Sequence, residues 1–311
     1  MCNLYRVYGL NLESEIQIPE LMKLCEDTPN IDVKINYGII SPEIKKMISQ
    51  GRNRQYKKDN AWFNVPNLAI FNITNGKQVI IEPYENADSQ LIKVYILGSV
   101  LGMVLLQKSM VAIHGGGIVI DNKGYVFTGD KGAGKSTLTT ALRQRGCQFV
   151  ADDVCSIKDG EKNKIYPGFG HQKLCEDTMI KLGYNPSEYK PFRSGLNIKY
   201  IVPALEEFVD YEVHFEGVFE ITVGDVKNVK IEEIIGIEKI QRMIKNIFRI
   251  EMFYYSGGIE LDYFKKCTQI AKNIKYYKIT RPKDVFSINE QIEAIEYIIY
   301  SDKEQNLENL G

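Results

Sequence analysis

The chain has 311 residues, enough for one large domain or two ordinary domains with buried cores. Its apolar content of 44% and charged content of 25% are typical of a soluble globular protein. The formal net charge of -1 excludes a strongly basic surface, so we expect no nucleic-acid partner.

The cysteines and the apolar segments favour a cytoplasmic protein. Six cysteines are scattered along the chain without a CxxC pair: Cys2, Cys25, Cys147, Cys155, Cys175 and Cys267. With only three histidines they predict free thiols in a reducing compartment and no zinc site. No leader sequence opens the chain, and the apolar stretch 94–106 is shorter than the ~20 residues that a membrane span needs, so it predicts a buried core helix.

The first 88 residues predict a small β-rich N-terminal domain. Short apolar runs at 4–9, 31–35, 68–73 and 78–82 are separated by polar turns, and Asn75-Gly76 is a hairpin signal. Trp62 and Phe63 are expected in its core. A helix over 89–106 is expected to open a second domain, 89–302, and residues 303–311 a polar tail that frays.

The second domain begins with alternating strands and turns and predicts an α/β fold, α+β overall. We expect strands at 111–114 and 118–120 on either side of Gly115–Gly117, then a strand at 125–128. A helix over 135–145 ends at Gly146, and the next strand, 147–151, ends in Asp152 and Asp153. Further strands are expected at 218–223 and 274–279, and an amphipathic helix near 288–300.

Residues 129–137 carry the strongest chemical signal. They satisfy the phosphate-binding pattern G-x-x-x-x-G-K-[ST], which follows an apolar strand and opens a helix, as the mechanism requires. The expected binding residues are Gly129, Asp130, Lys131, Gly132, Ala133, Gly134, Lys135, Ser136 and Thr137. Their N–H groups would face phosphate oxygens, while Lys135 would contact the β- and γ-phosphates and Ser136 would ligate Mg²⁺. The alternative is a glycine-rich turn that caps a helix beside a solvated lysine.

Asp152 and Asp153 are the second signal. They lie 17 and 18 residues after Lys135, and the gap holds one helix, a glycine turn and one strand. A right-handed crossover of this kind makes the two strands parallel, so the acid pair should lie at the same sheet edge as the P-loop. One carboxylate could then hold Mg²⁺ while the other accepts a proton from an attacking hydroxyl. The alternative is a strand-end turn whose carboxylates cap local backbone.

The three histidines are weaker candidates. His114 stands one strand upstream of the P-loop, where it could contact a phosphate, tune an aspartate or be a satisfied core side chain. His171 is expected in a surface loop, and His214 in a structural strand position.

These residues together resemble a known family. His114-Gly115, the segment from Tyr125 to Ser136, and Arg145-Gly-Cys-Gln-Phe-Val-Ala-Asp-Asp resemble the HPr serine kinase/phosphorylase family in order and spacing. The resemblance is strong over about 111–155 and weak over the rest of the second domain. The opening segment from Tyr5 to Leu21 is similar to HPr-kinase-like proteins of peptide-tailoring gene clusters, some of which resemble kinases for lasso-type precursor peptides.

The resemblance implies a P-loop kinase domain akin to HPr kinase and phosphoenolpyruvate carboxykinase, with ATP donating its γ-phosphate to a seryl hydroxyl. It assigns Asp152 as the general base and Asp153 as a Mg²⁺ support, and it places His114 against the transferred phosphate. The HPr kinases are oligomers, so the resemblance also implies a homo-oligomer. The expected partner is a serine-bearing peptide or small protein, and no membrane partner is expected.

One family feature is absent from the sequence. An L-E-I-R-G-type segment should follow the acid pair, but residues 168–177 stand at that place, so neither HPr as substrate nor the phosphorylase reaction is implied. Glu176 or Asp177 are candidates for the missing acid, and Arg193 and Lys199 for charge-neutralising contacts, although solvated surface positions fit both cations better. Two other functions stay open: a nucleotide-binding regulatory or scaffold module without efficient transfer, and a small-metabolite kinase.

Overall fold

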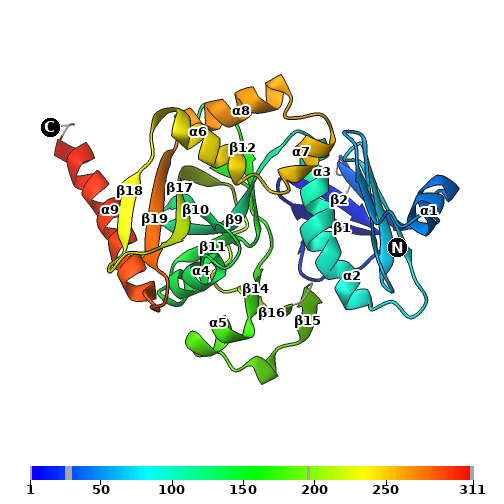
Figure 1. Cartoon of the computed structure of the whole chain (residues 1–311), viewed down its shortest axis with the longest axis horizontal. Coiled ribbons are helices and arrows are strands. Elements are labelled where there is room, and N and C mark those ends of the chain that lie inside the picture. Colours follow the sequence, from blue (N-terminus) through cyan, green and yellow to red (C-terminus); the bar gives the residue numbers. More distant parts are fainter. Residues whose placement is uncertain (1, 25–29, 195–196, 309–311) are drawn as a thin grey trace.

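The structure is a computed structural model that describes residues 2–24, 30–194 and 197–308 (Figure 1). Two large sheets and one small sheet are covered by helices, which confirms the predicted α/β class. The N-terminal sheet and the C-terminal helix lie at opposite ends of the molecule in Figure 1.

An eight-stranded sheet is built entirely from the N-terminal part of the chain. In spatial order its strands are β3 (Met22–Lys23), β1 (Asn3–Val7), β2 (Leu10–Ser14), β4 (Val33–Tyr37), β8 (Gln78–Pro83), β7 (Ala69–Thr74), β6 (Asn60–Val65) and β5 (Arg54–Tyr56). The hairpin predicted at Asn75-Gly76 joins β7 to β8, and both turn residues have positive φ. The short helix α1 (Pro42–Ser49) packs over Trp62, which is fully buried as expected.

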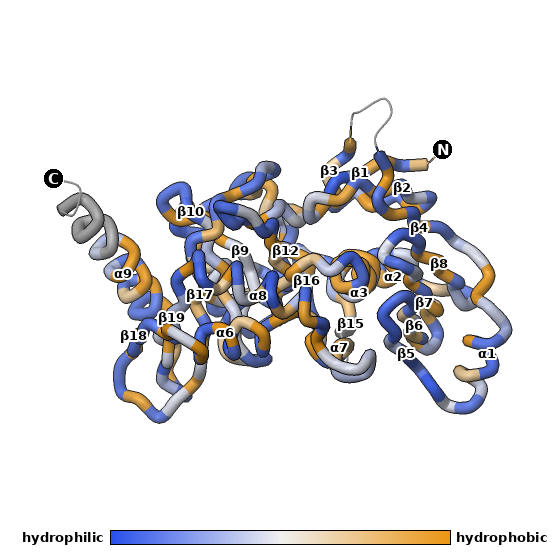
Figure 2. The backbone as a smooth tube through the Cα atoms, turned by 90° about the horizontal axis from the view of Figure 1, so that it is seen from above, coloured by the Kyte–Doolittle hydropathy of each residue, from blue (hydrophilic) through white to orange (hydrophobic). Residues whose placement is uncertain are grey.

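A continuous helical segment separates this sheet from the rest of the chain. It consists of α2 (Ser89–Tyr95), one π-helical turn, η1 (Ile96–Val100), and α3 (Leu101–Gln107). The segment matches the helix predicted over 89–106, and at 19 residues the whole helix is long and apolar enough to cross a membrane, although the apolar stretch 94–106 alone is not. More than half of the segment is buried inside the protein, as expected for a core helix, and the tube in Figure 2 is largely orange along α3.

The domain boundary near residue 88 stays a prediction. Buried side chains of the N-terminal sheet, of α3 and of the second half of the chain form one connected hydrophobic cluster. The two parts therefore share a core on either side of the helical segment.

The second large sheet supports the P-loop. Its strands are β9 (Val111–Ile120), β10 (Lys123–Gly129), β11 (Gln148–Ala151), β12 (Val154–Lys158), β13 (Lys164–Ile165), β17 (Val213–Gly224), β18 (Lys230–Glu233) and β19 (Lys275–Pro282). Strands β10, β17 and β19 are parallel neighbours, and consecutive side chains such as Val126 and Phe127 face opposite sides. Helices α4 (Lys135–Gln144) and α9 (Ile288–Glu308) contribute to the core on one face, and α6 (Gly236–Lys245) and α8 (Leu261–Lys272) to the core on the other.

Two details of this part differ from the sequence prediction. The two strands expected around Gly115–Gly117 are one strand, β9, because it pairs with β10 and β11 on its two sides along its second half. An added Cβ at Gly115 would lie 2.4 Å from the Phe127 carbonyl oxygen, so the glycine permits close strand packing. At the other end, the tail expected to fray from residue 303 continues as helix α9 through Glu308.

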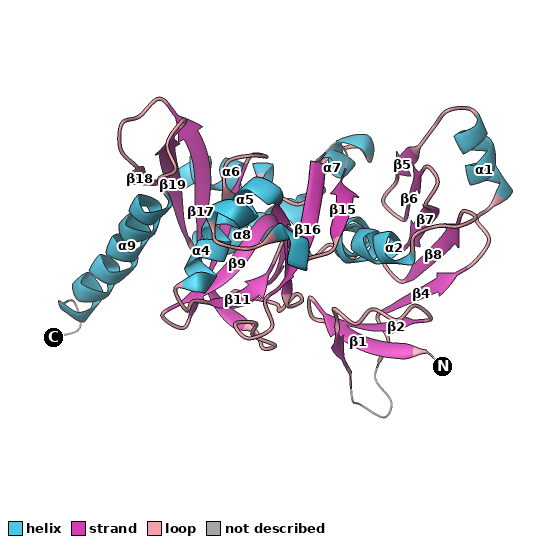
Figure 3. Ribbon diagram, turned by 90° about the horizontal axis from the view of Figure 1, so that it is seen from below, coloured by secondary structure: helices cyan, strands magenta, loops and turns pink. Residues whose placement is uncertain are grey.

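A third, three-stranded sheet stands beside the P-loop helix. Its order is β14 (His171–Cys175), β16 (Asn197–Pro203) and β15 (Pro191–Ser194), with α5 (Glu176–Lys181) and the 3₁₀ turn η2 (Pro186–Glu188) attached. The remaining short helix, α7 (Glu251–Tyr255), lies beside α3 in Figure 1 and on the side of the N-terminal sheet in Figure 3. Of the six cysteines, Cys25 lies outside the described residues and the other five are free thiols.

Candidate active site

The loop between β10 and α4 has the curled backbone that phosphate binding needs. Gly129 adopts φ 138°, and a Cβ there would lie 2.3 Å from the Ile221 carbonyl oxygen, so only glycine fits. Gly134 adopts φ 110° at the first residue before α4, whose regular bonding begins with Leu138 N–H donating to the Gly134 carbonyl at 2.9 Å. The helix N-terminus therefore adjoins the loop, where unsatisfied N–H groups favour an anion.

Arg281 fixes the outer side of this loop. From the end of β19, its Nε donates to the Ala133 carbonyl at 2.7 Å and its Nη2 donates to the Gly132 carbonyl at 3.3 Å. Because the Gly132 and Ala133 carbonyls point outward to the guanidinium, the neighbouring N–H groups of the loop tend to point inward, toward a bound phosphate. Arg281 was not predicted as a site residue, because a separation of 148 residues from Ala133 carries no spacing signal.

Lys135 lies across the mouth of the loop. Its Nζ donates to the Gly129 carbonyl at 2.8 Å and to the Asp130 carbonyl at 3.2 Å. Burial lowers the pKa of Lys135, and the nearby Asp153 carboxylate opposes that shift. The ammonium thus lies between the loop backbone and the acid pair, which is where the sequence predicts the β- and γ-phosphates.

The acid pair lies at the same sheet edge as the P-loop, as predicted. Strands β10 and β11 are both antiparallel to β9, so they run parallel to each other, although β9 stands between them. Thr128, one residue before the P-loop, is paired with Gly115, and Ala151, one residue before the pair, is paired with Gly117. The α4 crossover therefore brings the two strand ends together.

Asp152 is the buried member of the pair. It is 4% exposed, and its Oδ2 accepts the Lys173 backbone N–H at 3.0 Å. Burial, reinforced by the neighbouring Asp153 charge, raises the pKa of Asp152 to about 6, although Lys173 opposes the shift. A carboxylate with this pKa is ionised at neutral pH and well suited to accept a proton.

Asp153 has the opposite character. Burial alone would raise the pKa of Asp153, but the positive charge of Lys173, assisted by His114 and Lys199, holds it well below its usual range. Lys173 Nζ lies 2.5 Å from its Oδ2. The Asp153 backbone adopts φ 62°, a left-handed conformation in which the Asp153 carbonyl accepts the Gly115 N–H at 3.1 Å. The two adjacent carboxyls thus differ strongly in proton affinity, which is the pattern of a base beside a permanent anion.

His114 is held against this turn. Its Nδ1 lies 3.0 Å from the Asp153 carbonyl oxygen, which can only accept, so Nδ1 carries the proton. Burial lowers the pKa of His114, and the Asp153 carboxylate opposes the shift. The imidazole therefore presents Nε2 as an acceptor until a nearby negative charge favours its protonation; its contact with the transferred phosphate stays a prediction.

Lys173 is the main residue that the sequence prediction missed. It belongs to β14, which is tied to the P-loop helix through Gln172, whose Oε1 accepts from Arg143 Nη1 at 2.6 Å and from Thr140 Oγ1 at 3.1 Å. Burial would lower the pKa of Lys173, but Asp153 and Asp152 raise it. Lys173 therefore stays charged and neutralises the pair. Lys199, on the neighbouring strand β16, also acts on both carboxylates and is half-buried, so its expected solvated position was wrong.

The other candidates contribute less to the described site. Glu176 and Asp177 are exposed in the first turn of α5, and Asp177 Oδ2 lies 3.9 Å from Lys181. His171 begins β14 with its Nδ1 buried and without a hydrogen-bond partner among the described residues, which corrects its predicted surface-loop position. His214 lies on β17 and pairs with Glu216 at 3.3 Å. The Arg193 side chain lies outside the described residues.

Tyr8 reaches the acid pair from the N-terminal sheet. Its side chain is fully buried, and its hydroxyl has no hydrogen-bond partner among the described residues. Burial raises the pKa of Tyr8, and the Asp153 and Asp152 carboxylates raise it further, so the phenol stays protonated. A buried hydroxyl without a partner costs about 1–3 kcal/mol, and here it is a donor available to a bound group.

Tyr8→Phe is therefore expected to separate stability from activity. Removing an unsatisfied hydroxyl should leave the melting temperature unchanged or raised, while phosphoryl transfer slows about tenfold because a donor at the site is lost. Differential scanning calorimetry and single-turnover transfer rates measure the two effects. A marked fall in melting temperature would contradict this interpretation, because it would mean that the hydroxyl stabilises the native core.

The donor set near the P-loop fits Mg²⁺ rather than a transition metal. Among the described residues no group of three or more His, Cys, Asp or Glu side chains could enclose a metal. Mg²⁺ in nucleotide sites takes one or two carboxylates and completes its shell with phosphate and water oxygens. Ser136, in the first turn of α4, and the ionised Asp153 supply oxygen donors of this kind.

The chain has structural neighbours among solved proteins. No protein-family model and no curated protein matches the sequence. The chain is similar to the solved HPr(Ser) kinase/phosphatase from Coxiella burnetii, with 16% identity and a TM-score of 0.33, over 62% of this chain and 98% of that one.

Proposed function

We propose that this protein is an ATP- and Mg²⁺-dependent kinase that transfers the γ-phosphoryl group to a serine hydroxyl of a peptide or small protein. The observation that carries the proposal is the acid pair beside the P-loop, with the pKa of Asp152 raised to about 6 and that of Asp153 lowered. A site that only holds a nucleotide has no need for a buried base. The peptide class, and a ribosomal precursor peptide in particular, is supported by the resemblance of the 5–21 segment to HPr-kinase-like proteins of peptide-tailoring gene clusters.

The residues divide the transfer between them. The acceptor oxygen forms a bond to the γ-phosphorus while the bond from that phosphorus to the β,γ-bridging oxygen breaks, and ADP leaves. Asp152 takes the hydroxyl proton, and Lys135 neutralises negative charge on the phosphates. Lys173 keeps Asp153 ionised, and Asp153 and Ser136 would hold Mg²⁺, which neutralises charge on the phosphate oxygens when bound.

The pH dependence follows from the shifted pKa of Asp152. Because a raised carboxyl pKa keeps the base protonated at low pH, kcat/KM should fall about tenfold per pH unit below about 6 and level off above it. In Asp152→Asn, the residual kcat/KM should no longer fall below pH 6, because the group that titrates there is gone. Initial rates between pH 5 and pH 8, at fixed free Mg²⁺, measure both profiles. A wild-type profile that is flat below pH 6 would contradict the assignment of the base.

Serine as acceptor is tested with matched peptides. Peptides identical except for serine, threonine or alanine at one position are incubated with γ-labelled ATP and Mg²⁺, and phosphorylated products are located by mass spectrometry. We expect label in the serine peptide, less in the threonine peptide and none in the alanine peptide. Label that persists in the alanine peptide would overturn serine as the acceptor. Tight ATP binding with neither phosphopeptide nor ADP would instead favour a regulatory module.

A further inference from the structure

A groove opens between the edge of the N-terminal sheet and the helical segment that covers it. Its volume is about 450 Å³, within the usual range of ligand sites. Aromatic rings from Tyr56, Phe63 and Tyr95 line it, together with the guanidinium groups of Arg54 and Arg249. No carboxylate side chain belongs to this lining among the residues that the structure describes.

One wall of the groove packs against the cluster around the acid pair. Ser99, in the π-helical turn, accepts a hydrogen bond from Arg249 Nη2 at 2.8 Å. The preceding residue, Gly98, is so close to Lys173 that an added Cβ would lie 3.7 Å from Nζ. Phe248, which precedes Arg249, has its ring 5.8 Å from the His114 ring. Ser99 and Arg249, which line the groove, are therefore each next in sequence to a residue that packs near Lys173 or His114, and both of these contact Asp153.

The groove wall and the P-loop meet the acid pair through different lysines. Lys135, in the P-loop, interacts electrostatically with Asp153, and Lys173, which pairs with Asp153, lies near Gly98 beside the groove wall. In-line transfer requires the attacking hydroxyl to approach the γ-phosphorus opposite the leaving ADP. The groove is lined by other residues than the P-loop, so it is separate from the site that would hold ADP, as an acceptor site must be.

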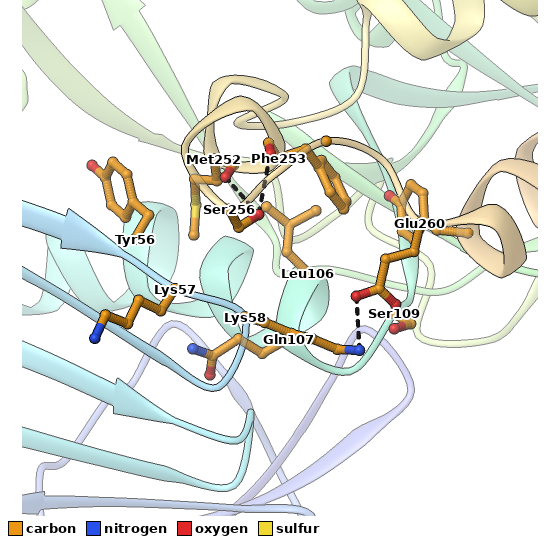
Figure 4. A pocket seen from close by; sticks show the side chains of 12 residues that line it. Tyr56, Lys57, Lys58, Leu106, Gln107, Ser109, Met252, Phe253, Ser256 and Glu260 are labelled. Carbon is orange, nitrogen blue, oxygen red and sulfur yellow. Dashed lines mark hydrogen bonds and ion pairs between the residues drawn. The ribbon is translucent and has the colours of Figure 1, made fainter.

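A neighbouring cavity does not compete for this role. It holds only about 50 Å³, room for a few water molecules, and lies between Tyr56, the end of α3 and α7 (Figure 4). The ion pair between Lys58 and Glu260, at 2.7 Å, crosses beside it. The larger groove is therefore the one with room for side chains of a bound polypeptide.

The charges of the groove identify the class of occupant. The Arg54 side chain is exposed and has no hydrogen-bond or ion-pair partner among the described residues. Arg249 donates to Ser99, lies over the Phe248 ring and has a 3.5 Å ion-pair contact with Glu251. Guanidinium groups bind carboxylates through paired hydrogen bonds, and the adjacent rings offer apolar surface. The groove thus complements a segment that carries acidic and apolar side chains together.

We infer that this groove binds an acidic segment of the acceptor polypeptide and so delivers its serine to Asp152. The inference rests on the proposed kinase function, but binding and transfer can be measured separately. Arg54 is the residue that selects carboxylate side chains, and the aromatic rings hold the apolar side chains of the segment.

The transfer experiment compares peptides that carry one serine with several glutamates, glutamines or lysines on one side of it. Wild-type protein should phosphorylate the glutamate peptide best. Arg54→Glu should lower kcat/KM for that peptide about tenfold, leave the glutamine peptide nearly unchanged and leave the KM for ATP unchanged. Arg52→Glu, the same charge reversal at an exposed position outside the groove, should behave as wild type. Equal selectivity in wild type and Arg54→Glu would overturn the inference.

A binding experiment keeps the groove testable if no transfer occurs. Fluorescein-labelled forms of the same peptides are titrated against the full chain with Mg²⁺ and a non-hydrolysable ATP analogue, and anisotropy is recorded. Tighter binding of the glutamate peptide that is lost in Arg54→Glu but kept in Arg52→Glu supports the groove, even where the kinase proposal fails. Binding that does not distinguish the three peptides overturns the groove, even where phosphoryl transfer is observed.

Discussion

Asp152→Asn is expected to slow phosphoryl transfer at least ~10²-fold, as for the loss of a general base. The amide keeps the size of the side chain and an oxygen that can still accept the Lys173 backbone N–H. It cannot take the hydroxyl proton. The substitution also removes a carboxyl whose charged form is disfavoured by burial, so the melting temperature at pH 8 should not fall.

Single-turnover rates with γ-labelled ATP and a serine peptide measure this effect, and equilibrium titration gives the affinity for ATP. The affinity should change little, because the base acts on the acceptor and not on the nucleotide. Asp159→Asn, an identical change at an exposed residue, is the matched control. Near-normal transfer by Asp152→Asn would remove Asp152 from the role of base, and a loss of ATP binding would assign it to the nucleotide site instead.

Lys135→Ala is expected to cost at least ~10²-fold in transfer as well, through a different cause. The variant loses the ammonium that lies across the loop mouth, so charge on the phosphates in the transition state is left uncompensated. A weaker affinity for ATP should accompany the slower rate, because the same charge acts in the bound ground state.

The split between kcat and KM distinguishes Lys135→Ala from Asp152→Asn, since only the lysine variant should raise the KM for ATP. Lys162→Ala, at an exposed loop position, is the control for the loss of one lysine charge. Unchanged ATP binding and transfer in Lys135→Ala would mean that the P-loop does not hold the triphosphate in the predicted orientation.

The parts of the site that are local in sequence could be predicted. The P-loop occupies nine consecutive residues, and its glycines specify the backbone conformation that the structure has at Gly129 and Gly134. The position of Asp152 and Asp153 followed from one helix and one strand, because a short crossover leaves few arrangements. The left-handed backbone of Asp153 could not be predicted from the sequence. Neither could the raised pKa of Asp152 and the lowered pKa of Asp153, since these depend on burial and charge from other segments.

Residues from distant segments were missed for the same reason. Lys173 contacts Asp153 because hydrogen bonds of Gln172 hold β14 against the P-loop helix, and no residue spacing in the sequence predicts that contact. Tyr8 and Arg281 come from opposite ends of the chain and meet the site only in the folded protein. The continuous strand β9 was read as two because three glycines normally interrupt a strand, whereas here Gly115 allows close approach to β10.

A site that moves a phosphoryl group to a hydroxyl, and does not merely hold a nucleotide, gives a definite set of products. Phosphorus NMR of the wild-type protein with ATP, Mg²⁺ and a serine peptide that carries glutamates follows every phosphate species in one sample. We expect ADP and a phosphoserine signal to rise together in equal amounts, and neither to rise with Lys135→Ala or Asp152→Asn. ATP that stays intact, or ADP that appears only with inorganic phosphate, would contradict this expectation.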